Sequence, residues 1–366
     1  MIEKKNYNIG EWSEIYALLK LIETKKLFSA DENLNRIKND DNENDLFFPV
    51  LKIIREEIET ETLEFFPATS ESSFVQIFLN NIKILEVPFN EFSENADDLF
   101  SKMKNYNKDE LFSALGKVLS FLESINIKKI KQKSNKKADI LLQIHDIYTG
   151  YKPIVGFSIK SKIGSPPTLF NSSAATHFIF QVENIKPNEI DKINSINSPS
   201  QRFSEIFAQN RNLRFVKMDN KTFHDNLVMI DSSMPIIMAK MLIAYYSGQA
   251  TKCSEVVDFL NKLNLSTTNL PKNFLEYKFK EFLCAVALGM KPATVWDGKD
   301  EANGGYIIVK RDGDIVAYHL YNRDFFKEYL YKGTKFDKPD SRINYGFLYE
   351  ENNKVYIKLT PQIRFI

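Results

Sequence analysis

The amino-acid sequence predicts a mixed α/β (α+β) fold, on three observations. An early segment carries apolar residues at helical spacing, the middle holds two runs with the alternation of strands, and the C-terminal part has the pattern of antiparallel hairpins. The chain of 366 residues is 43% hydrophobic and 27% charged, which is typical of a folded globular protein. This composition excludes a disordered chain and a miniature disulfide scaffold.

The N-terminal part is predicted to contain both helices and strands. Residues 10–22 form an amphipathic stripe, and residues 108–125 form a second one. Residues 33–44 are polar and predict a loop. Residues 46–59 and 73–85 combine strand and helix signals, so their class stays open.

Two strand-like runs in the middle of the chain predict a β-hairpin. Residues 138–144 and 154–161 are the strands, and Gly150 to Pro153 supply the turn. A Gly-Ser-Pro-Pro segment at 164–167 ends the second strand. Residues 172–182 fit either a short helix or a further strand.

The C-terminal part changes from helices to hairpins. The best candidate boundary is the Pro- and Asn-rich segment 186–200, with 217–227 as an alternative. We therefore expect one region over residues 1–200 and a helical and antiparallel β region over residues 201–366. The elements expected there are helices at 234–246, 254–263, 277–288 and 324–330, and hairpins at 306–310 with 315–321 and at 345–349 with 355–359.

Charge is sorted along the chain although the net charge is only +1. The segment from Asp31 to Glu64 is acid-rich, whereas six lysines lie between Lys128 and Lys137 with no acid among them. Such lysine clusters are mostly solvated faces, and a minority bind nucleic acid.

Composition also argues against several classes of protein. Cys253 and Cys284 have no partners at metal-ligand spacing and are expected to be reduced core thiols. The four histidines are scattered, which argues against a zinc hydrolase or a His-metal finger nuclease. No segment approaches the ~18 uninterrupted apolar residues of a membrane span, so we expect a cytoplasmic protein with no membrane partner.

The predicted hairpin brings together side chains with a recognisable chemistry. Asp139 begins one strand, and Ser158 and Lys160 share a face of the next. A carboxylate, a lysine and a basic approach are what metal-assisted phosphodiester hydrolysis needs, with Mg²⁺ as the metal and Lys160 to position or deprotonate water. Spacing alone favours the alternative of a solvated cross-strand ion pair.

The second acidic ligand is the open question in this arrangement. Serine stands at position 158, two residues before Lys160, where a second acid is expected. Glu11 and Glu14, three residues apart on the first predicted helix, lie on one flank of it and could supply the acid. Glu183 is a third candidate. Without the hairpin, both helix acids would be interpreted as surface residues near a helix N-terminus.

Several long strings carry a resemblance that covers the chain from Gly10 to Phe365. In this order they resemble the HpaII-type restriction endonucleases, within the PD-(D/E)XK nuclease superfamily. The strings are GEWSEIYALLKL, KADILLQI, GFSIKSKIGSPPTLFNSSAATHF, FKEFLCAVALGMKPATVWDG, GGYIIVKRDGDIVAYHLYNR and KLTPQIRF.

The resemblance implies a nuclease core, a mixed sheet flanked by helices, over residues 1–200. It implies Mg²⁺-dependent cleavage of double-stranded DNA, with Asp139 as metal ligand and Lys160 as the motif lysine. A serine at position 158 resembles the arrangement in other nucleases that cut CCGG-containing sites. In those nucleases an acid from a neighbouring helix takes the place of the missing second metal ligand. We therefore expect metal on Asp139, the Ile159 carbonyl and Glu14 or, after it, Glu11.

The resemblance further implies cleavage at CCGG, a cognate DNA cytosine methyltransferase and, for a symmetric site, a homodimer. Bidentate arginine is the usual reader of guanine, and residues 201–366 are expected to serve DNA recognition or subunit contact. The expected DNA-binding residues are Lys136, Lys137, Lys162, Arg323, Arg342, Gln362 and Arg364. Two alternatives remain: a DNA-binding protein on a degenerate nuclease fold, and a repair nuclease without sequence specificity.

Overall fold

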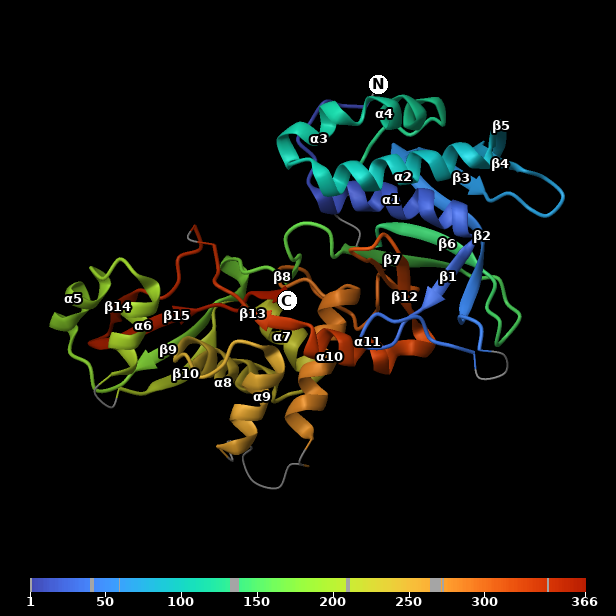
Figure 1. Cartoon of the computed structure of the whole chain (residues 1–366). Coiled ribbons are helices and arrows are strands. Elements are labelled where there is room, and N and C mark those ends of the chain that lie inside the picture. The colour runs from blue at the N-terminus through green and yellow to red at the C-terminus, as the bar shows by residue number, and fades with distance from the viewer. Residues whose placement is uncertain are drawn as a thin grey trace. The chain divides into compact units, whose positions relative to one another are not determined.

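The computed structural model describes residues 2–39, 43–58, 60–131, 138–208, 211–263, 271, 273–340 and 342–366. The chain divides into two compact units (Figure 1). The first comprises Met1–Pro167 and Asp300–Phe326, and the second comprises Thr168–Lys299 and Lys327–Ile366. Both contain helices and sheets, so the predicted mixed α+β class is confirmed.

The first unit is built on a nine-stranded sheet in the order β1-β12-β11-β7-β6-β2-β3-β4-β5. Strand β1 also pairs with β2, so the pairings from β1 through β12, β11, β7, β6 and β2 close into a ring. The strands are β1 (Lys26–Ser29), β2 (Phe47–Ile58), β3 (Glu61–Phe66), β4 (Phe74–Leu79), β5 (Ile82–Pro88), β6 (Ile140–Ile144), β7 (Ile154–Ser161), β11 (Gly305–Val309) and β12 (Ile315–His319).

Strand β7 lies between an antiparallel and a parallel neighbour. Ile140 of β6 pairs with Phe157, and Tyr306 of β11 pairs in parallel with Ser158. Gly305 has a φ of +120°, and a Cβ there would lie 1.9 Å from the carbonyl oxygen of Tyr318. Only glycine therefore allows β12 to approach β11 this closely.

Helix α1 (Ile9–Thr24) covers part of this sheet and begins with a capping box. The Asn8 side chain accepts from the Glu11 backbone N, and the Glu11 side chain accepts from the Asn8 backbone N. Trp12, Leu18 and Leu19 of this helix are fully or almost fully buried. Helix α2 (Phe89–Asn105) packs beside α1, as Figure 1 shows. The predicted helix at 10–22 is thus confirmed.

One expectation for this unit, the helix at 108–125, needs correction. The predicted single helix at 108–125 is two helices, α3 (Lys108–Ala114) and α4 (Gly116–Ser124), because the chain leaves helical geometry at Leu115. Helix α2 had no prediction. Segments 46–59 and 73–85, whose class was open, form strands in their described parts.

The second unit contains two small sheets. One has the order β10-β9-β15-β14 and the other β13-β16-β8. Their strands are β8 (Thr168–Phe170), β9 (Phe178–Val182), β10 (Leu213–Met218), β13 (Thr334–Phe336), β14 (Leu348–Glu351), β15 (Lys354–Leu359) and β16 (Ile363–Phe365). The helices around them are α5 (Ile190–Asn194), α6 (Pro199–Phe207), α7 (Lys221–Ile230), α8 (Met234–Tyr246), α9 (Cys253–Lys262) and α10 (Phe274–Leu288).

The C-terminal helices and hairpins lie close to their predicted positions, and the two predicted hairpins join different sheets. Hairpin β14–β15 turns at Asn352 and Asn353 and joins β9 of the second unit. Hairpin β11–β12 instead joins the first unit through parallel pairing with β7. The two units therefore differ from a division at residue 200, because residues 300–326 complete the nine-stranded sheet of the first unit. Helix α11 (Arg323–Lys332) crosses the sequence boundary between the units.

No single helix among the described residues is long and apolar enough to cross a membrane. Helices α7 and α8 pass the length and composition test only as a pair that is bent by 104°.

Candidate active site

Asp139 is fixed at the open end of the β6–β7 hairpin. Its backbone N donates to the Phe157 carbonyl at 2.8 Å, which continues the pairing just before β6 begins. Its Oδ2 accepts from the Ser158 hydroxyl at 3.1 Å and from the Ile159 backbone N at 2.7 Å. The Asp139 carboxylate thus accepts the Ile159 N–H bond that a backbone carbonyl would accept within the β6–β7 pairing. The hydroxyl and N–H donors of β7 therefore orient the carboxylate.

Ser158 and Lys160 lie on β7 next to this carboxylate. Ser158 is buried and Lys160 is half-buried, and their partners on β11 are Tyr306 and Ile308. Because residues two apart on a strand share a face, the Lys160 side chain projects on the side of Ser158 and its Asp139 contact. Over the described part of the chain, the Lys160 ammonium has no ion pair and no hydrogen-bond acceptor.

The start of α1 lies near the end of β7. The helix packs against β7, and a Cβ on Gly164, in the loop after β7, would lie 3.5 Å from the Cβ of Ile9. Glu11 already uses both carboxylate oxygens, one on the Asn8 backbone N at 2.8 Å and one on Lys131 at 3.2 Å. Glu14, one turn further along, is half-buried.

The donor set here fits a hard divalent cation. Asp139 Oδ2 is held by two donors, while its Oδ1 accepts no hydrogen bond within the described residues. The N–H and C=O of one residue point to the same edge of a strand, so the Ile159 carbonyl points to the edge where its N–H meets Asp139. In the parts of the chain that the structure describes, no group of three or more His, Cys, Asp or Glu residues could hold a metal. A carboxylate oxygen beside a backbone carbonyl is an all-oxygen donor set, which suits a hard divalent cation.

The predicted lysine cluster is only partly within the described residues. Lys128 pairs with Glu61 at 2.7 Å and Lys131 pairs with Glu11 at 3.2 Å. These two lysines are therefore engaged with acids of their own chain. Lys136 and Lys137, predicted to contact DNA, lie outside the described residues.

Comparison with known proteins decides the family. The profile of the HpaII restriction endonuclease family matches residues 8–365. The chain is also 40% identical over 369 residues to the type II restriction enzyme HpaII of Haemophilus parainfluenzae, with 100% of both chains covered. The chain belongs to the HpaII restriction endonuclease family. No solved structure matches it.

Family membership settles the class of activity. The protein is a type II restriction endonuclease, a sequence-specific nuclease whose substrate is DNA, and it uses a divalent metal cofactor. The predicted family and enzyme class are confirmed.

The second unit of this restriction endonuclease holds several residues that were predicted to bind DNA. Arg342 is exposed and forms a two-bond pair with Asp340 at 2.9 and 2.7 Å. Arg364 pairs with Asp337 at 2.7 Å. Gln362 is buried, donates to the Lys338 carbonyl at 3.0 Å and accepts from the Ser172 hydroxyl at 2.9 Å. Both ends of the Gln362 amide are thus used within the chain.

Two further predicted residues are also held by ion pairs. Arg323, in the first unit, pairs with Asp300 at 3.0 Å. Glu183, the third candidate for the metal site, lies in the second unit and pairs with Arg214 at 3.3 Å. Asp139 belongs to the first unit.

Lys162 and Arg311 lie beyond the end of β7. Burial, and then the charge of Arg311, lowers the pKa of Lys162. Sequence reasoning proposed Lys162 but missed Arg311. A single arginine in a turn carries no spacing signal, and only the pairing of β7 with β11, strands that lie far apart in the sequence, brings Arg311 to this edge.

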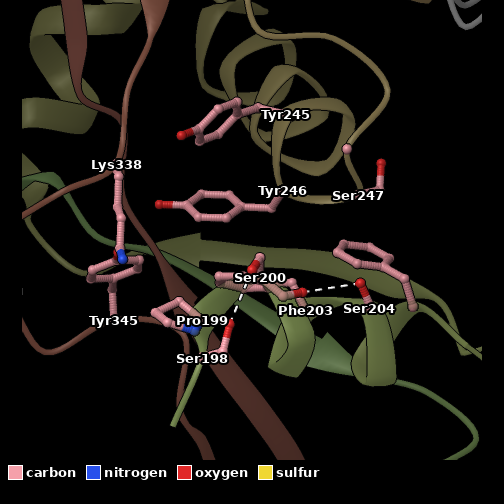
Figure 2. Close-up of a pocket in the computed structure, with 12 residues that line it drawn as sticks. Ser198, Pro199, Ser200, Phe203, Ser204, Tyr245, Tyr246, Ser247, Lys338 and Tyr345 are labelled. Atoms are coloured by element: carbon pink, nitrogen blue, oxygen red, sulfur yellow. Dashed lines mark hydrogen bonds between the residues drawn. The ribbon is translucent and has the colours of Figure 1, made fainter. Parts of the chain in front are cut away.

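A separate cavity of about 360 Å³ lies in the second unit of the endonuclease (Figure 2). Aromatic residues from α6 and α8 and the serines of α6 line it, with Lys338 at its side. None of the residues predicted for catalysis lines it. Its rings pack on each other, with the centroids of Phe203 and Tyr246 4.5 Å apart, which indicates a structural role.

Proposed function

We propose that this endonuclease depends on Mg²⁺, cuts double-stranded DNA at CCGG, and uses the β6–β7 hairpin as its active site. The observation that carries the proposal is the Asp139 carboxylate, held by Ser158 and the Ile159 backbone N, with Lys160 two residues along the same strand. The choice of CCGG rests on the likeness to the HpaII type.

In this proposal the metal is held by Asp139 Oδ1, the Ile159 carbonyl and Glu14. Glu14 is placed before Glu11 in this proposal, as the family resemblance implies, and both Glu11 oxygens contact the helix cap and Lys131. When bound, the metal neutralises charge on the scissile phosphate and lowers the pKa of a coordinated water.

The protein residues position the reacting groups. The Ser158 hydroxyl and the Ile159 N–H keep the Asp139 carboxylate in one rotamer, which leaves Oδ1 as the metal-facing oxygen. Lys160, which has no anionic partner within the described residues, directs its ammonium at the attacking water and at the charge that develops on the phosphate.

The finer expectations about partners belong to the same proposal. A palindromic site is matched by a homodimer in which each subunit cuts one strand. Among the proposed base-reading residues, Arg342 is the most accessible, with a side chain 88% exposed, whereas Gln362 must first break two hydrogen bonds. In this proposal a cognate cytosine methyltransferase protects the host DNA. We therefore expect the cytosines of CCGG sites in the host DNA to be methylated.

Digestion of a plasmid of known sequence tests the proposed specificity. The purified protein is incubated with Mg²⁺ or with EDTA, and the fragment ends are sequenced. We expect discrete Mg²⁺-dependent fragments that all end at CCGG. Discrete ends at another short sequence would overturn CCGG, and smeared fragments would favour a nuclease without sequence specificity. If the plasmid stays uncut while the protein is folded and bound to DNA, the result would favour a DNA-binding protein on a degenerate nuclease fold. The serine at position 158, where an acid is expected, is the reason for considering this alternative.

Light scattering of the protein with and without DNA tests the oligomeric state. The expected mass is that of two chains in the DNA complex. A single chain per cleaved duplex would contradict the proposed homodimer.

A further inference from the structure

We infer that Arg311, together with Lys162, binds a backbone phosphate that adjoins the scissile phosphate on the DNA strand being cut. The inference rests on the proposed function, because it takes Asp139 and Lys160 as the point of cleavage.

The extended backbone of β7 continues to Lys162, two residues beyond Lys160. Ser161 pairs with Val309 at the end of the parallel β7–β11 ladder. The Lys162 backbone N still donates to the Val309 carbonyl at 2.8 Å, so the extended geometry continues for one more residue. Lys160 and Lys162 therefore share a face, about 6.6 Å apart along the strand at ~3.3 Å per residue.

Arg311 reaches this edge from the turn between β11 and β12. Its Nε donates to the Lys162 carbonyl at 3.3 Å. This bond orients the guanidinium group and leaves Nη1 and Nη2 for another acceptor. Arg311 is exposed. Burial and the Arg311 charge both act on the neighbouring ammonium, so that the pKa of Lys162 is lowered, as expected where two cations lie close together.

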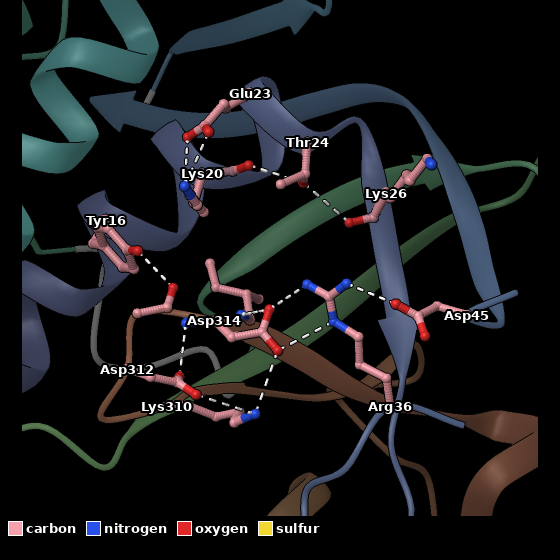
Figure 3. Close-up of polar contacts among 12 residues, drawn as sticks. Tyr16, Lys20, Glu23, Thr24, Lys26, Arg36, Asp45, Lys310, Asp312 and Asp314 are labelled. Carbon is pink, nitrogen blue, oxygen red and sulfur yellow. Dashed lines mark hydrogen bonds and ion pairs between the residues drawn. The ribbon is translucent and has the colours of Figure 1, made fainter. Parts of the chain in front are cut away.

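The acids of the same turn do not neutralise Arg311. Asp312 pairs with Lys310 at 3.5 Å, and Asp314 pairs with Arg36 at 2.6 Å and with Lys310 at 3.4 Å. Figure 3 shows these carboxylates facing Lys310 and Arg36. Within the described residues, Arg311 has no carboxylate partner.

These observations together describe an anion site at the catalytic edge. Lys160, Lys162 and Arg311 bring three cations to the edge where Asp139 and Glu14 form the proposed metal site, and the substrate is a polyanion. Guanidinium groups match phosphate oxygens with two donors, and phosphates of one DNA strand recur every ~3.4 Å along the helix axis. A phosphate next to the scissile one therefore lies within reach of Arg311.

Three substitutions at Arg311 separate charge from local structure. Arg311→Gln keeps a donor for the Lys162 carbonyl but removes the charge, Arg311→Ala removes both, and Arg311→Lys keeps the charge. Arg214→Ala is the matched control, since Arg214 is 57% exposed and is paired with Glu183 in the second unit. Urea unfolding of each variant checks that the fold is kept.

DNA affinity is measured in EDTA, where no cleavage occurs, over a range of salt concentrations. We expect Arg311→Gln and Arg311→Ala to weaken binding by about 10- to 100-fold and to reduce the slope of log K against log salt by about 1. Arg311→Lys should restore most of the salt slope, and Arg214→Ala should match the wild type. Wild-type affinity and slope in folded Arg311→Gln would overturn the inference.

Duplexes with one neutral methylphosphonate, moved one position at a time around the cut, identify the phosphate. In the wild type we expect one flanking position to weaken binding about tenfold, and in Arg311→Ala the same position should have no effect. An unchanged profile in Arg311→Ala would overturn the inference. Cleavage by Asp139→Asn at the wild-type rate would instead refute the proposed catalytic site, so the two failures are distinguishable.

Discussion

Loss of the Glu57 side chain is predicted to destabilise the first unit, where Glu57 contacts the segment that leads to Asp139. Its side chain is fully buried and forms an ion pair with Arg55 Nε at 2.6 Å. Its other oxygen accepts from the backbone N of Lys128 at 2.8 Å and of Lys129 at 3.1 Å. Arg55 also donates to the carbonyls of Lys129 and Ile130. The pair thus ties β2 to the segment that leads to Asp139.

The size of the expected change in the free energy of unfolding follows from the groups that Glu57→Ala leaves without a partner. The Arg55 side chain is only 5% exposed, so the change strands a buried guanidinium, which costs about 3–5 kcal/mol. The backbone N–H groups of Lys128 and Lys129 also lose their acceptor on the fully buried Glu57 side chain. The free energy of unfolding of the first unit should therefore fall by about 3–5 kcal/mol.

Urea unfolding followed by tryptophan fluorescence measures this change. The chain has two tryptophans, and Trp12 is buried in the first unit. A Trp296→Phe background makes Trp12 the sole reporter. The control is Glu94→Ala, which removes an exposed pair with Lys117 and should change the free energy by less than ~0.5 kcal/mol.

A double variant tests the cause of the loss. Arg55→Met with Glu57→Ala removes the stranded charge, so it should be more stable than Glu57→Ala alone. A loss below ~1 kcal/mol in Glu57→Ala, or a double variant less stable than the single one, would refute the reasoning about the buried pair.

Three further predictions concern the site and the sheet around it. Ser158→Ala removes one of the two donors to Asp139, so single-turnover cleavage should slow roughly tenfold; an unchanged rate would show that the remaining donor suffices. Burial lowers the pKa of His319 from 6.5 to about 4, although the charge of Asp146 raises it. The unfolded chain therefore binds a proton that the folded chain does not, and stability should fall by about 3 kcal/mol as pH drops from 6.5 to 4. His319→Phe should lose this pH dependence in urea titrations, and equal dependence in both proteins would contradict it. Gly313 has a φ of +90°, and a Cβ there would lie 3.0 Å from the Tyr16 hydroxyl, so Gly313→Ala should lower stability by about 1–3 kcal/mol; a wild-type unfolding midpoint would contradict this.

Local sequence signals predicted the elements that local geometry determines. Strand β7 occupies residues 154–161 as predicted, since alternation is a property of the strand alone. Asn352 and Asn353 adopt φ values of 51° and 57°, which is the geometry of a tight hairpin turn and the reason for the Asn pair. The neighbourhood of Asp139 and Ser158 was predictable for the same reason, because one short hairpin brings them together.

Long-range pairing was not predictable in this way. The apolar stripe at 108–125 continues through Leu115, so nothing in its spacing marks the break between α3 and α4. The parallel pairing of β11 with β7 joins segments far apart in the sequence. Arg311 reaches the edge of the proposed active site only because of that pairing, and no pattern around position 311 could have indicated it.

Single-turnover cleavage of a duplex that contains the recognition site, by wild type, Asp139→Asn and Lys160→Met, tests the central claim most directly. Asp139→Asn keeps the shape of the side chain that Ser158 and Ile159 hold, and Lys160→Met keeps the apolar stem. Fluorescence anisotropy measures DNA binding by the same proteins. We predict a loss of cleavage of at least ~10³-fold in both variants, with affinity within a few-fold of wild type. Wild-type cleavage by either variant would contradict the assignment of the β6–β7 hairpin as the active site.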